Sequence, residues 1–310
     1  MAEESRRWRK PTIPAFGFTV ETAAPDGRFG LSALVAEVGE AALWRGHLRE
    51  TSDRLGMLVF DDLAEVDPRR VIQLMEAIEA ATAAPRPGEV VVTGFADDTE
   101  RVLVLLEPLL GISLRTLLVR DAPLDPASAI DLVGALAGAM VASHRDGACW
   151  GGIEPEFVVV RSDDEAFGVQ VLPARLCQLA VGRTDSESLG IHGICYRAPE
   201  FFLGEAPTPA TDVFSLGVIL FELLVGEAPF EGHNIKTLVA RLISTPVRRV
   251  SATTTFREAQ AAAASPLAAD EVAAIEAIID RLTGKAPRER PADAEAALAL
   301  LASLRPARAG

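Results

Sequence analysis

Glutamates, cysteines and histidines are the side chains of this chain whose types could support chemistry. The three cysteines, Cys149, Cys177 and Cys195, have no CxxC spacing, and none of the four histidines lies at ligand spacing from a cysteine. A zinc site is therefore not predicted, and the odd, scattered cysteines are typical of a reducing cytoplasm. The acids that would bind a divalent metal if the fold brought them together are Glu40, Glu76, Glu154 and Glu156.

Charge and hydropathy exclude several classes of function. The 310 residues carry a formal net charge of -14, which disfavours binding to nucleic acid or to an anionic membrane surface. Residues 1–16 include basic side chains but no apolar core after them, so we expect no signal peptide. The apolar run around Val213–Val225 is interrupted by Glu222 and is too short to span a bilayer. We expect a cytoplasmic protein that binds neither nucleic acid nor membrane.

The first third of the chain has the pattern of a small sheet with one helix. A helix is predicted at 68–83, where Val71, Leu74 and Ile78 share one stripe at helical spacing. Pro68 stands where a helix can begin. Short apolar stretches predict strands at 31–38, 41–48, 54–60, 89–95 and 100–108.

Past Leu109 the pattern becomes mostly helical. Two short strands are expected around a polar turn at 162–165, and the Ala-rich stretch 257–268 indicates a loop or the start of a helix. The predicted helices lie at 126–147, 210–225, 234–244, 269–283 and 292–304. These elements predict a small β-rich part followed by a larger helical part.

Residues 196–230 carry a resemblance that fixes a register for the whole chain. The sequence YRAPE at 196–200 runs into DVFSLGVILFELLVGEAPF at 212–230, and RERP follows at 288–291. Together these segments resemble the protein kinase family, in particular a bacterial-type serine/threonine kinase domain.

The resemblance implies an α+β, bilobal protein kinase-like fold, with a small five-stranded β lobe carrying one helix and a large, mostly helical lobe. The implied boundaries are an N-terminal extension at 1–30, the small lobe at 31–108, the large lobe at 109–305 and a tail at 306–310.

Three retained residues have structural roles in this register. The resemblance implies that Glu200 and Arg290 form a buried ion pair that ties the end of the activation segment to the large lobe. It also implies that Asp212 accepts backbone N–H bonds from the catalytic loop. The simpler interpretation of Asp212 is an acid at the start of a helix, which the helix dipole favours.

The phosphate-binding elements of the small lobe are altered. In the hairpin, the three family glycines correspond to Ala36, Val38 and Ala41, and a β-branched valine keeps the backbone away from a phosphate. Gly39 is out of phase with these positions, and Glu40 adds a negative charge. Leu58 replaces the lysine that binds phosphates, and the helix acid Glu76 is then interpreted as an exposed side chain.

The catalytic loop is altered as well. Residues 150–157, WGGIEPEF, correspond to the family sequence His-Arg-Asp-Leu-Lys-Pro-Glu-Asn. Gly152 replaces the catalytic base, Glu154 the lysine and Phe157 the metal-binding Asn, while Pro173 begins the sequence that replaces Asp-Phe-Gly. Neither magnesium position then has an oxygen-bearing side chain, and magnesium requires oxygen ligands.

Two other motifs have a simpler interpretation. The literal sequence His144-Arg145-Asp146 lies at the end of a predicted helix, upstream of the aligned loop, and is interpreted as a polar helix terminus. The hydroxyls of Thr184, Ser186 and Ser188 are interpreted either as phosphorylation sites or as members of an ordinary polar loop.

These alterations predict a pseudokinase that is not an enzyme, binds no Mg-ATP or metal, and acts as a protein-interaction or allosteric signalling module. The expected partner is a protein, either an active kinase or the substrate of one. The predicted docking surface is either the cleft side of the lobes or the faces of the activation segment and large lobe. The second surface consists of Phe201, Phe202, Leu203 and residues 227–244.

Two alternatives remain open from the sequence. The first is a divergent ATP-binding serine/threonine protein kinase, or another transferase, that uses the acids named above. The second is a protein that binds a different small ligand in the former nucleotide cleft, lined by Val38, Leu58, Leu106 and Phe157.

Overall fold

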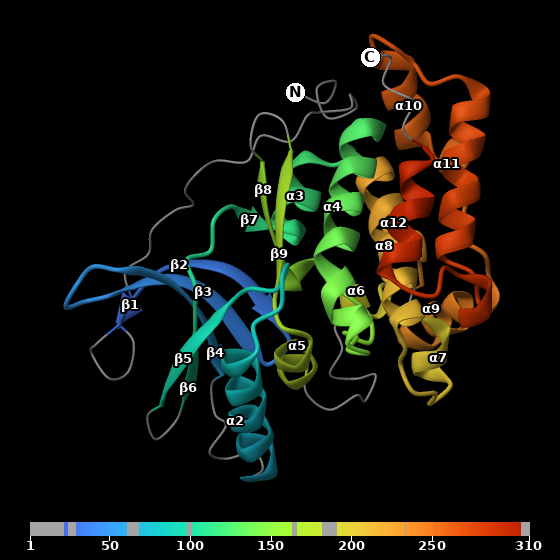
Figure 1. The fold of residues 1–310 in the computed structure, drawn as a ribbon. Coiled ribbons are helices and arrows are strands. Elements are labelled where there is room, and N and C mark those ends of the chain that lie inside the picture. The colour runs from blue at the N-terminus through green and yellow to red at the C-terminus, as the bar shows by residue number, and fades with distance from the viewer. Residues whose placement is uncertain are drawn as a thin grey trace.

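The structure is a computed structural model. It describes residues 22–23, 29–60, 68–97, 101–162, 166–181, 191–232 and 234–304. The chain folds into a β-rich small lobe and a helical large lobe, which lie side by side (Figure 1). The α+β bilobal fold expected from the sequence is confirmed.

An antiparallel sheet forms the small lobe, with strand order β1-β2-β3-β4-β6-β5. The strands are β1 (Thr22–Ala23), β2 (Phe29–Val38), β3 (Ala41–Leu48), β4 (Arg54–Phe60), β5 (Val92–Asp97) and β6 (Val102–Leu106). The two-residue strand β1 pairs with β2 at the edge of the sheet, so residues in the range assigned to the N-terminal extension contribute to the sheet. The other five strands are those that the sequence predicts.

Both faces of this sheet are buried. On β4, Leu58 and Phe60 belong to the main core that the two lobes share, whereas Met57 and Val59 belong to a second cluster on the opposite face. Successive residues of a strand point to opposite faces. The continuous apolar sequence of β4 therefore reflects burial on both sides.

Helix α2 (Pro68–Ala83) packs beside β5 and against helix α5 (Ala174–Val181), the first helix after the β9 strand (Figure 1). Of the predicted stripe, Leu74 and Ile78 are buried and Val71 is partly buried, and Ala77 is buried beside them. This contact matters for the site because α2 belongs to the small lobe and α5 to the large lobe.

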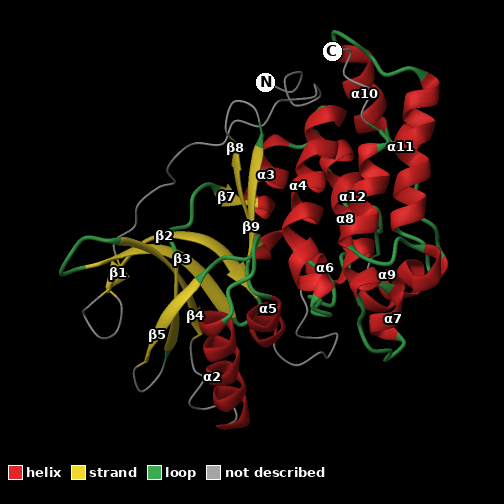
Figure 2. Cartoon of the chain, viewed as in Figure 1, coloured by secondary structure: helices red, strands yellow, loops and turns green. Residues whose placement is uncertain are grey.

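The large lobe is built from helices and one small sheet, as Figure 2 shows. The sheet has the order β7-β8-β9, with β7 (Ile112–Ser113), β8 (Val158–Ser162) and β9 (Phe167–Val171). The remaining elements are α3 (Leu114–Asp121), α4 (Pro126–Arg145), η2 (Pro155–Phe157), α6 (Ile191–Ile194), α7 (Pro199–Phe202), α8 (Pro209–Val225), α9 (Ile235–Ser244), η3 (Val250–Ala252), α10 (Thr254–Ala262), α11 (Ala269–Leu282), η4 (Pro287–Glu289) and α12 (Ala294–Ala302).

Helix α8 is the centre of the large lobe. All its residues from Ala210 to Val225 are buried, and α4, α11 and α12 pack around it. Thr208 precedes it as the N-cap, and Gly226 ends it in the left-handed conformation at φ +81°, which glycine adopts without a steric penalty. The helix is hydrophobic on all sides because it is enclosed on all sides.

Among the described helices, α4 is the one whose length and composition would allow it to cross a membrane. More than half of its most apolar window is buried inside the molecule, where α4 packs on α8 and α12. An apolar helix buried in this way has the character of a core helix.

Two helices differ from the sequence expectation. Helix α10 occupies part of the Ala-rich stretch and begins at the N-cap Thr253, whose hydroxyl accepts a hydrogen bond from the Phe256 N–H. Helix α5 was not predicted. Its buried residues Leu176, Cys177 and Ala180 have helical spacing, so the sequence did carry a helical signal at this position.

Candidate functional site

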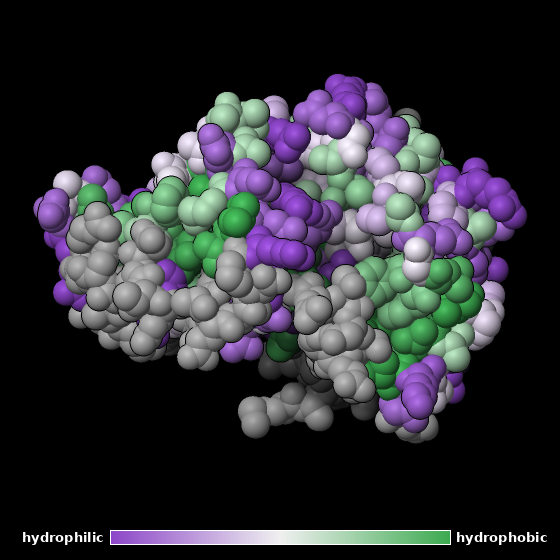
Figure 3. Space-filling view, turned by 90° about the horizontal axis from the view of Figure 1, so that it is seen from below, coloured by the Kyte–Doolittle hydropathy of each residue, from purple (hydrophilic) through white to green (hydrophobic). Residues whose placement is uncertain are grey.

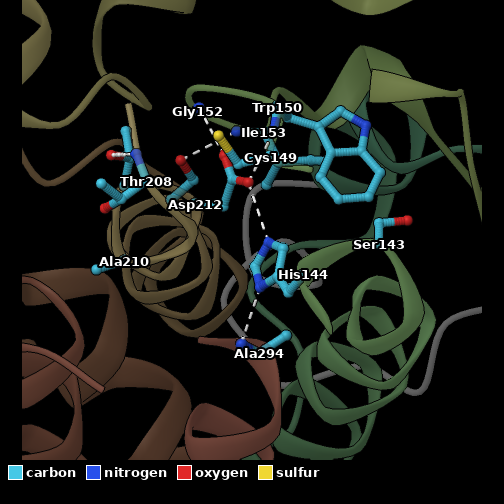
Figure 4. A network of polar contacts seen from close by, with 12 residues as sticks. Ser143, His144, Cys149, Trp150, Gly152, Ile153, Thr208, Ala210, Asp212 and Ala294 are labelled. Carbon is cyan, nitrogen blue, oxygen red and sulfur yellow. Dashed lines mark hydrogen bonds and ion pairs between the residues drawn. The ribbon is translucent and has the colours of Figure 1, made fainter. Parts of the chain in front are cut away.

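The aligned catalytic loop is held by one buried carboxylate. Both oxygens of Asp212, on the first turn of α8, accept backbone N–H bonds at 2.8 Å, Oδ2 from Trp150 and Oδ1 from Gly152 (Figure 4). Ser215 extends this arrangement, because its Oγ accepts from the Ile153 N–H at 3.1 Å and donates to the Tyr196 carbonyl at 2.7 Å. The loop backbone is therefore fixed although its side chains are altered.

His144 orients Asp212 from the end of α4. Its Nδ1 accepts the Ala294 N–H at 2.9 Å, and its Nε2 lies 3.1 Å from Asp212 Oδ2 (Figure 4). A backbone N–H can only donate, so Nδ1 carries no proton and Nε2–H donates to the carboxylate. The histidine of the literal His-Arg-Asp sequence thus supports the loop from outside it.

The other two residues of that sequence point elsewhere. Arg145 forms an exposed ion pair with Glu295 on α12 at 2.6 Å. Asp146 pairs with Arg86 at 3.0 Å. The structure therefore places the sequence at a helix terminus, as its polar pattern indicates.

Side chains at the junction of the lobes are apolar and buried. Leu58 is 0% and Phe157 1% exposed, and Val38 and Leu106 are 0% exposed. All four belong to the main core, and β2 contacts η2, on which Phe157 lies. Hydrocarbon thus occupies the positions where the family has its lysine and its metal-binding Asn. Also buried are Ala36, Ala41 and Pro173.

A buried ion pair occupies the catalytic loop. The Arg197 guanidinium donates through Nη1 to the Gly151 carbonyl at 2.8 Å and through Nη2 to Glu154. Burial raises the pKa of Glu154, and the charge of Arg197 opposes this rise. The lysine of the family is thus replaced by an acid that a neighbouring arginine neutralises.

Gly152 leaves room for this arginine. Its φ is +112°, and a Cβ atom built on it would lie 3.0 Å from Arg197 Cδ. A side chain at this position would be strained by the backbone conformation and crowded by Arg197. The identity of residue 152 therefore has a structural cause.

A second polar cluster lies beside the loop. Arg115 Nε donates to Glu156 Oε1 at 2.7 Å, and the other nitrogens of Arg115 contact Glu222 at 3.2 Å and Tyr196 at 3.0 Å. The Tyr196 hydroxyl donates to Glu222, and burial followed by this charge raises the pKa of Tyr196. Within the described part of the chain, the buried Oε2 of Glu156 has no hydrogen-bond partner.

The remaining candidate acids lie apart from this cluster. Glu40, at the tip of the β2–β3 hairpin, pairs with Arg70 on α2 at 2.6 Å. Glu76 is exposed. Among the residues that the structure describes, no three His, Cys, Asp or Glu side chains come together to hold a metal ion. Phe157 and Pro173, at the positions where the family binds magnesium, have no oxygen-bearing side chains and do not fit the metal. No chemical step is therefore assigned to a metal ion.

Glu200 and Arg290 come together as a bidentate pair inside the large lobe, at 2.7 Å and 2.8 Å. Arg290 also donates to carbonyls of residues 210, 284 and 285, and it stacks over the ring of Phe214. Burial alone would raise the pKa of Glu200, but the hydrogen bonds and charge of Arg290 outweigh it and lower the pKa.

Lys285 beside this pair gives a pH-dependent expectation. Burial, together with the nearby charge of Arg290, lowers the pKa of Lys285 from 10.5 to about 8. Between these values the unfolded chain keeps a proton that the folded chain loses, so folding stability rises with pH. Removing the charge in Lys285→Met should gain about 1–2 kcal/mol in the free energy of unfolding near pH 7 after solvent screening is allowed for. Loss of the hydrogen bond from Lys285 Nζ to the Leu242 carbonyl opposes this gain equally at each pH below 8.

This gain should shrink as the pH approaches 10. Urea unfolding of both proteins at pH 7, 8, 9 and 10 measures it. Because other groups titrate equally in the two proteins, the difference between them isolates Lys285. A difference that stays constant over this range would show that the ammonium titrates normally.

The retained frame agrees with the comparison with known families. The family model for "Protein kinase domain" matches residues 64–300. The chain belongs to the protein kinase family. Weaker similarity is found to serine/threonine-protein kinase PknL of Mycobacterium tuberculosis and of Mycobacterium bovis, each 25% identical over 146 residues. That match covers 47% of this chain but only 37% of PknL.

This membership corrects two predictions. The sequence predicts that the chain is not an enzyme and binds no Mg-ATP, and both predictions are wrong. The family match and the similarity to PknL point to a serine/threonine kinase, and such kinases normally use Mg-ATP. Phosphoryl transfer depends mainly on positioning and electrostatics. The prediction of inactivity weighed side chains such as Leu58 and Phe157 and left out the retained frame around Asp212.

Several residues of the kinase domain were missed by sequence reasoning. The partners of Arg197, His144 and Arg115 lie far away in the chain. No spacing of neighbouring residues in the sequence predicts such partners. The arginine of YRAPE was visible as a motif, but its pairing with Glu154 was not. Thr184, Ser186 and Ser188 lie outside the described residues. Protein kinase membership also implies protein partners in general, as substrates or regulators.

Proposed function

We propose that this chain is a divergent serine/threonine protein kinase domain that binds ATP between its lobes and signals through a protein bound to its large lobe. The observation that carries the proposal is the hold of Asp212 on the catalytic loop, through the Trp150 and Gly152 N–H groups. Positioning of this kind supplies a large part of the rate in phosphoryl transfer.

The polar groups beside the loop support the proposal. The unpaired Oε2 of Glu156 is an acceptor without a donor, and buried acceptors are normally satisfied. A substrate hydroxyl is the kind of donor it lacks. We therefore assign to Glu156 the role of orienting the hydroxyl, in place of the residue lost at Gly152. Because its Oε2 is enclosed in this structure, this role requires the loop to open toward the substrate.

Hydrophobic side chains at one end of the large lobe support docking of a protein partner. Figure 3, which shows the molecule from below, has a patch of hydrophobic residues on the side of the large lobe, at the right of the view. Leu203 is 59% exposed, Phe201 and Phe202 are partly exposed, and α7 packs against α9. The partner class remains as first proposed, an active kinase or the substrate of one. The free thiols of all three cysteines support a cytoplasmic location.

Transfer of labelled phosphate from ATP to a generic protein substrate tests the proposal. Loss of the usual general base costs about 10²–10⁴ in rate, so we expect transfer that many times slower than the about 1–100 s⁻¹ typical of kinases. Glu156→Gln should abolish the remaining phosphate transfer, because it removes the carboxylate that orients the hydroxyl. The variant should still fold, because Arg115 keeps its contacts with Glu222 and Tyr196.

Glu295→Gln is the matched control, since that acid is exposed and its ion-pair partner among the described residues is Arg145. It should transfer phosphate at the wild-type rate. Transfer that persists unchanged in Glu156→Gln would remove the role given to Glu156. A wild-type protein that transfers no phosphate at any enzyme concentration would refute catalysis itself.

A further inference from the structure

The tip of the β2–β3 hairpin is fastened to helix α5 of the large lobe. We propose that this fastening is a latch, in which Glu40 and Arg70 hold two carbonyls in the last turn of α5, and that ATP reaches the junction of the lobes only when it opens. The contact itself stands on the structure alone. Its effect on ATP rests on the function proposed above.

Two backbone carbonyls near the end of α5 are the hydrogen-bond acceptors of the latch. The Glu40 N–H donates to the Ala180 carbonyl at 2.7 Å, and Arg70 Nη2 donates to the Leu179 carbonyl at 3.0 Å. The last carbonyls of a helix have no partner within the helix. Here the hairpin and α2 supply those partners from the small lobe.

The side chain of Glu40 joins the two donors. Its carboxylate contacts Arg70 Nη1 at 2.6 Å, with Arg70 mostly buried and Glu40 about half-exposed. Arg70 lies in the first turn of α2, where the helix dipole disfavours a cation. An arginine at this position is therefore not favoured by α2 itself. Its contacts with Glu40 in the hairpin and with Leu179 in α5 favour it instead.

Gly39 makes the close approach possible. Its φ is +60°, and a Cβ atom built on it would lie 2.3 Å from the Ala180 carbonyl oxygen. Any other residue would push the hairpin tip off the helix. The glycine that is out of phase with the family's phosphate-binding glycines therefore fits a different contact.

The latch opposes nucleotide binding because it uses the same backbone. A glycine-rich hairpin of a kinase covers the phosphates of ATP, whereas here the Glu40 N–H is donated to α5. Helix α5 follows directly after Pro173, at the position of the metal-binding segment. The Glu40 carboxylate would also repel a triphosphate. Opening the latch removes the first obstacle, because the Glu40 N–H and the hairpin tip are then free of α5.

Hydrogen–deuterium exchange of single variants tests the latch without any nucleotide. Glu40→Gln and Arg70→Gln each remove the charge pair. Exchange at residues 36–42 and 178–181 should become about two- to fivefold faster, which is the size of effect expected from a partly exposed ion pair. Glu37→Gln is the matched control. It removes the same charge from an exposed position on the same hairpin and should exchange like wild type.

ATP titration of the same proteins tests the consequence. If the latch lowers the fraction of open molecules, both latch variants should bind ATP about two- to fivefold more tightly than wild type and Glu37→Gln. Unchanged exchange in both latch variants would overturn the latch. Faster exchange with equal ATP affinity would overturn its control over the nucleotide. Faster exchange in both latch variants, with no ATP binding in any of the proteins, would support the latch contact and refute the proposed binding of ATP.

Discussion

Removing the guanidinium of Arg290 is expected to lower the free energy of unfolding by about 3–5 kcal/mol. Arg290→Ala leaves Glu200, whose side chain is 2% exposed, as an unpaired charge inside the large lobe. The variant also removes donors from three backbone carbonyls. Urea unfolding followed by tryptophan fluorescence measures the loss.

Two further variants show whether the charge is the cause. Arg145→Ala breaks an exposed pair whose side chains are 65% and 60% exposed, and we expect a loss below about 1 kcal/mol. The double variant Glu200→Gln/Arg290→Met should be more stable than Arg290→Ala, because it leaves no buried charge. If Arg290→Ala and Arg145→Ala lost the same stability, the buried pair would have no special role.

Replacing Asp212 by alanine is expected to cost about 3 kcal/mol or more, because each buried donor left without an acceptor costs about 1–3 kcal/mol. The variant leaves the Trp150 N–H, the Gly152 N–H and the His144 Nε2–H unsatisfied. The loop should also lose its fixed backbone, so exchange at 149–153 should increase in the folded state.

Asp212→Asn tests how much of the Asp212 contribution to stability comes from its hydrogen bonds and how much from the packing of its side chain. Its amide oxygen still accepts one N–H, so we expect it to fall between wild type and Asp212→Ala in urea unfolding. Ser215→Ala, which removes the neighbouring acceptor of Ile153 N–H, should cost less than either. Equal stability of wild type and Asp212→Ala would show that the loop is held by something else.

Much of the small lobe could be predicted because its signals are local. The predicted bounds of β3, β4 and α2 match the structure, since alternation and helical spacing are set by neighbouring residues. Strand β1 has two residues and no pattern of its own. Helix α5 was missed although Leu176, Cys177 and Ala180 carry a helical signal.

The site could be predicted only in part, because its contacts join distant residues. The pair Glu200–Arg290 and the role of Asp212 followed from recognisable motifs. Glu154–Arg197 and Glu40–Arg70 have no motif, and their partners are brought together by the packing of the two lobes. The prediction that the chain is not an enzyme had a different cause. It rested on missing side chains at positions such as Leu58 and Phe157, and it gave no weight to the backbone contacts of Asp212 that the motifs already implied.

Binding of ATP is the central claim, and isothermal titration calorimetry of the full chain with ATP and Mg²⁺ tests it most directly. The account predicts saturable binding of one ATP per chain, with a dissociation constant between about 1 μM and 1 mM, which corresponds to about 8 to 4 kcal/mol of binding free energy. Titrations that show no heat of binding at millimolar ATP, in wild type and in Glu40→Gln alike, would contradict it.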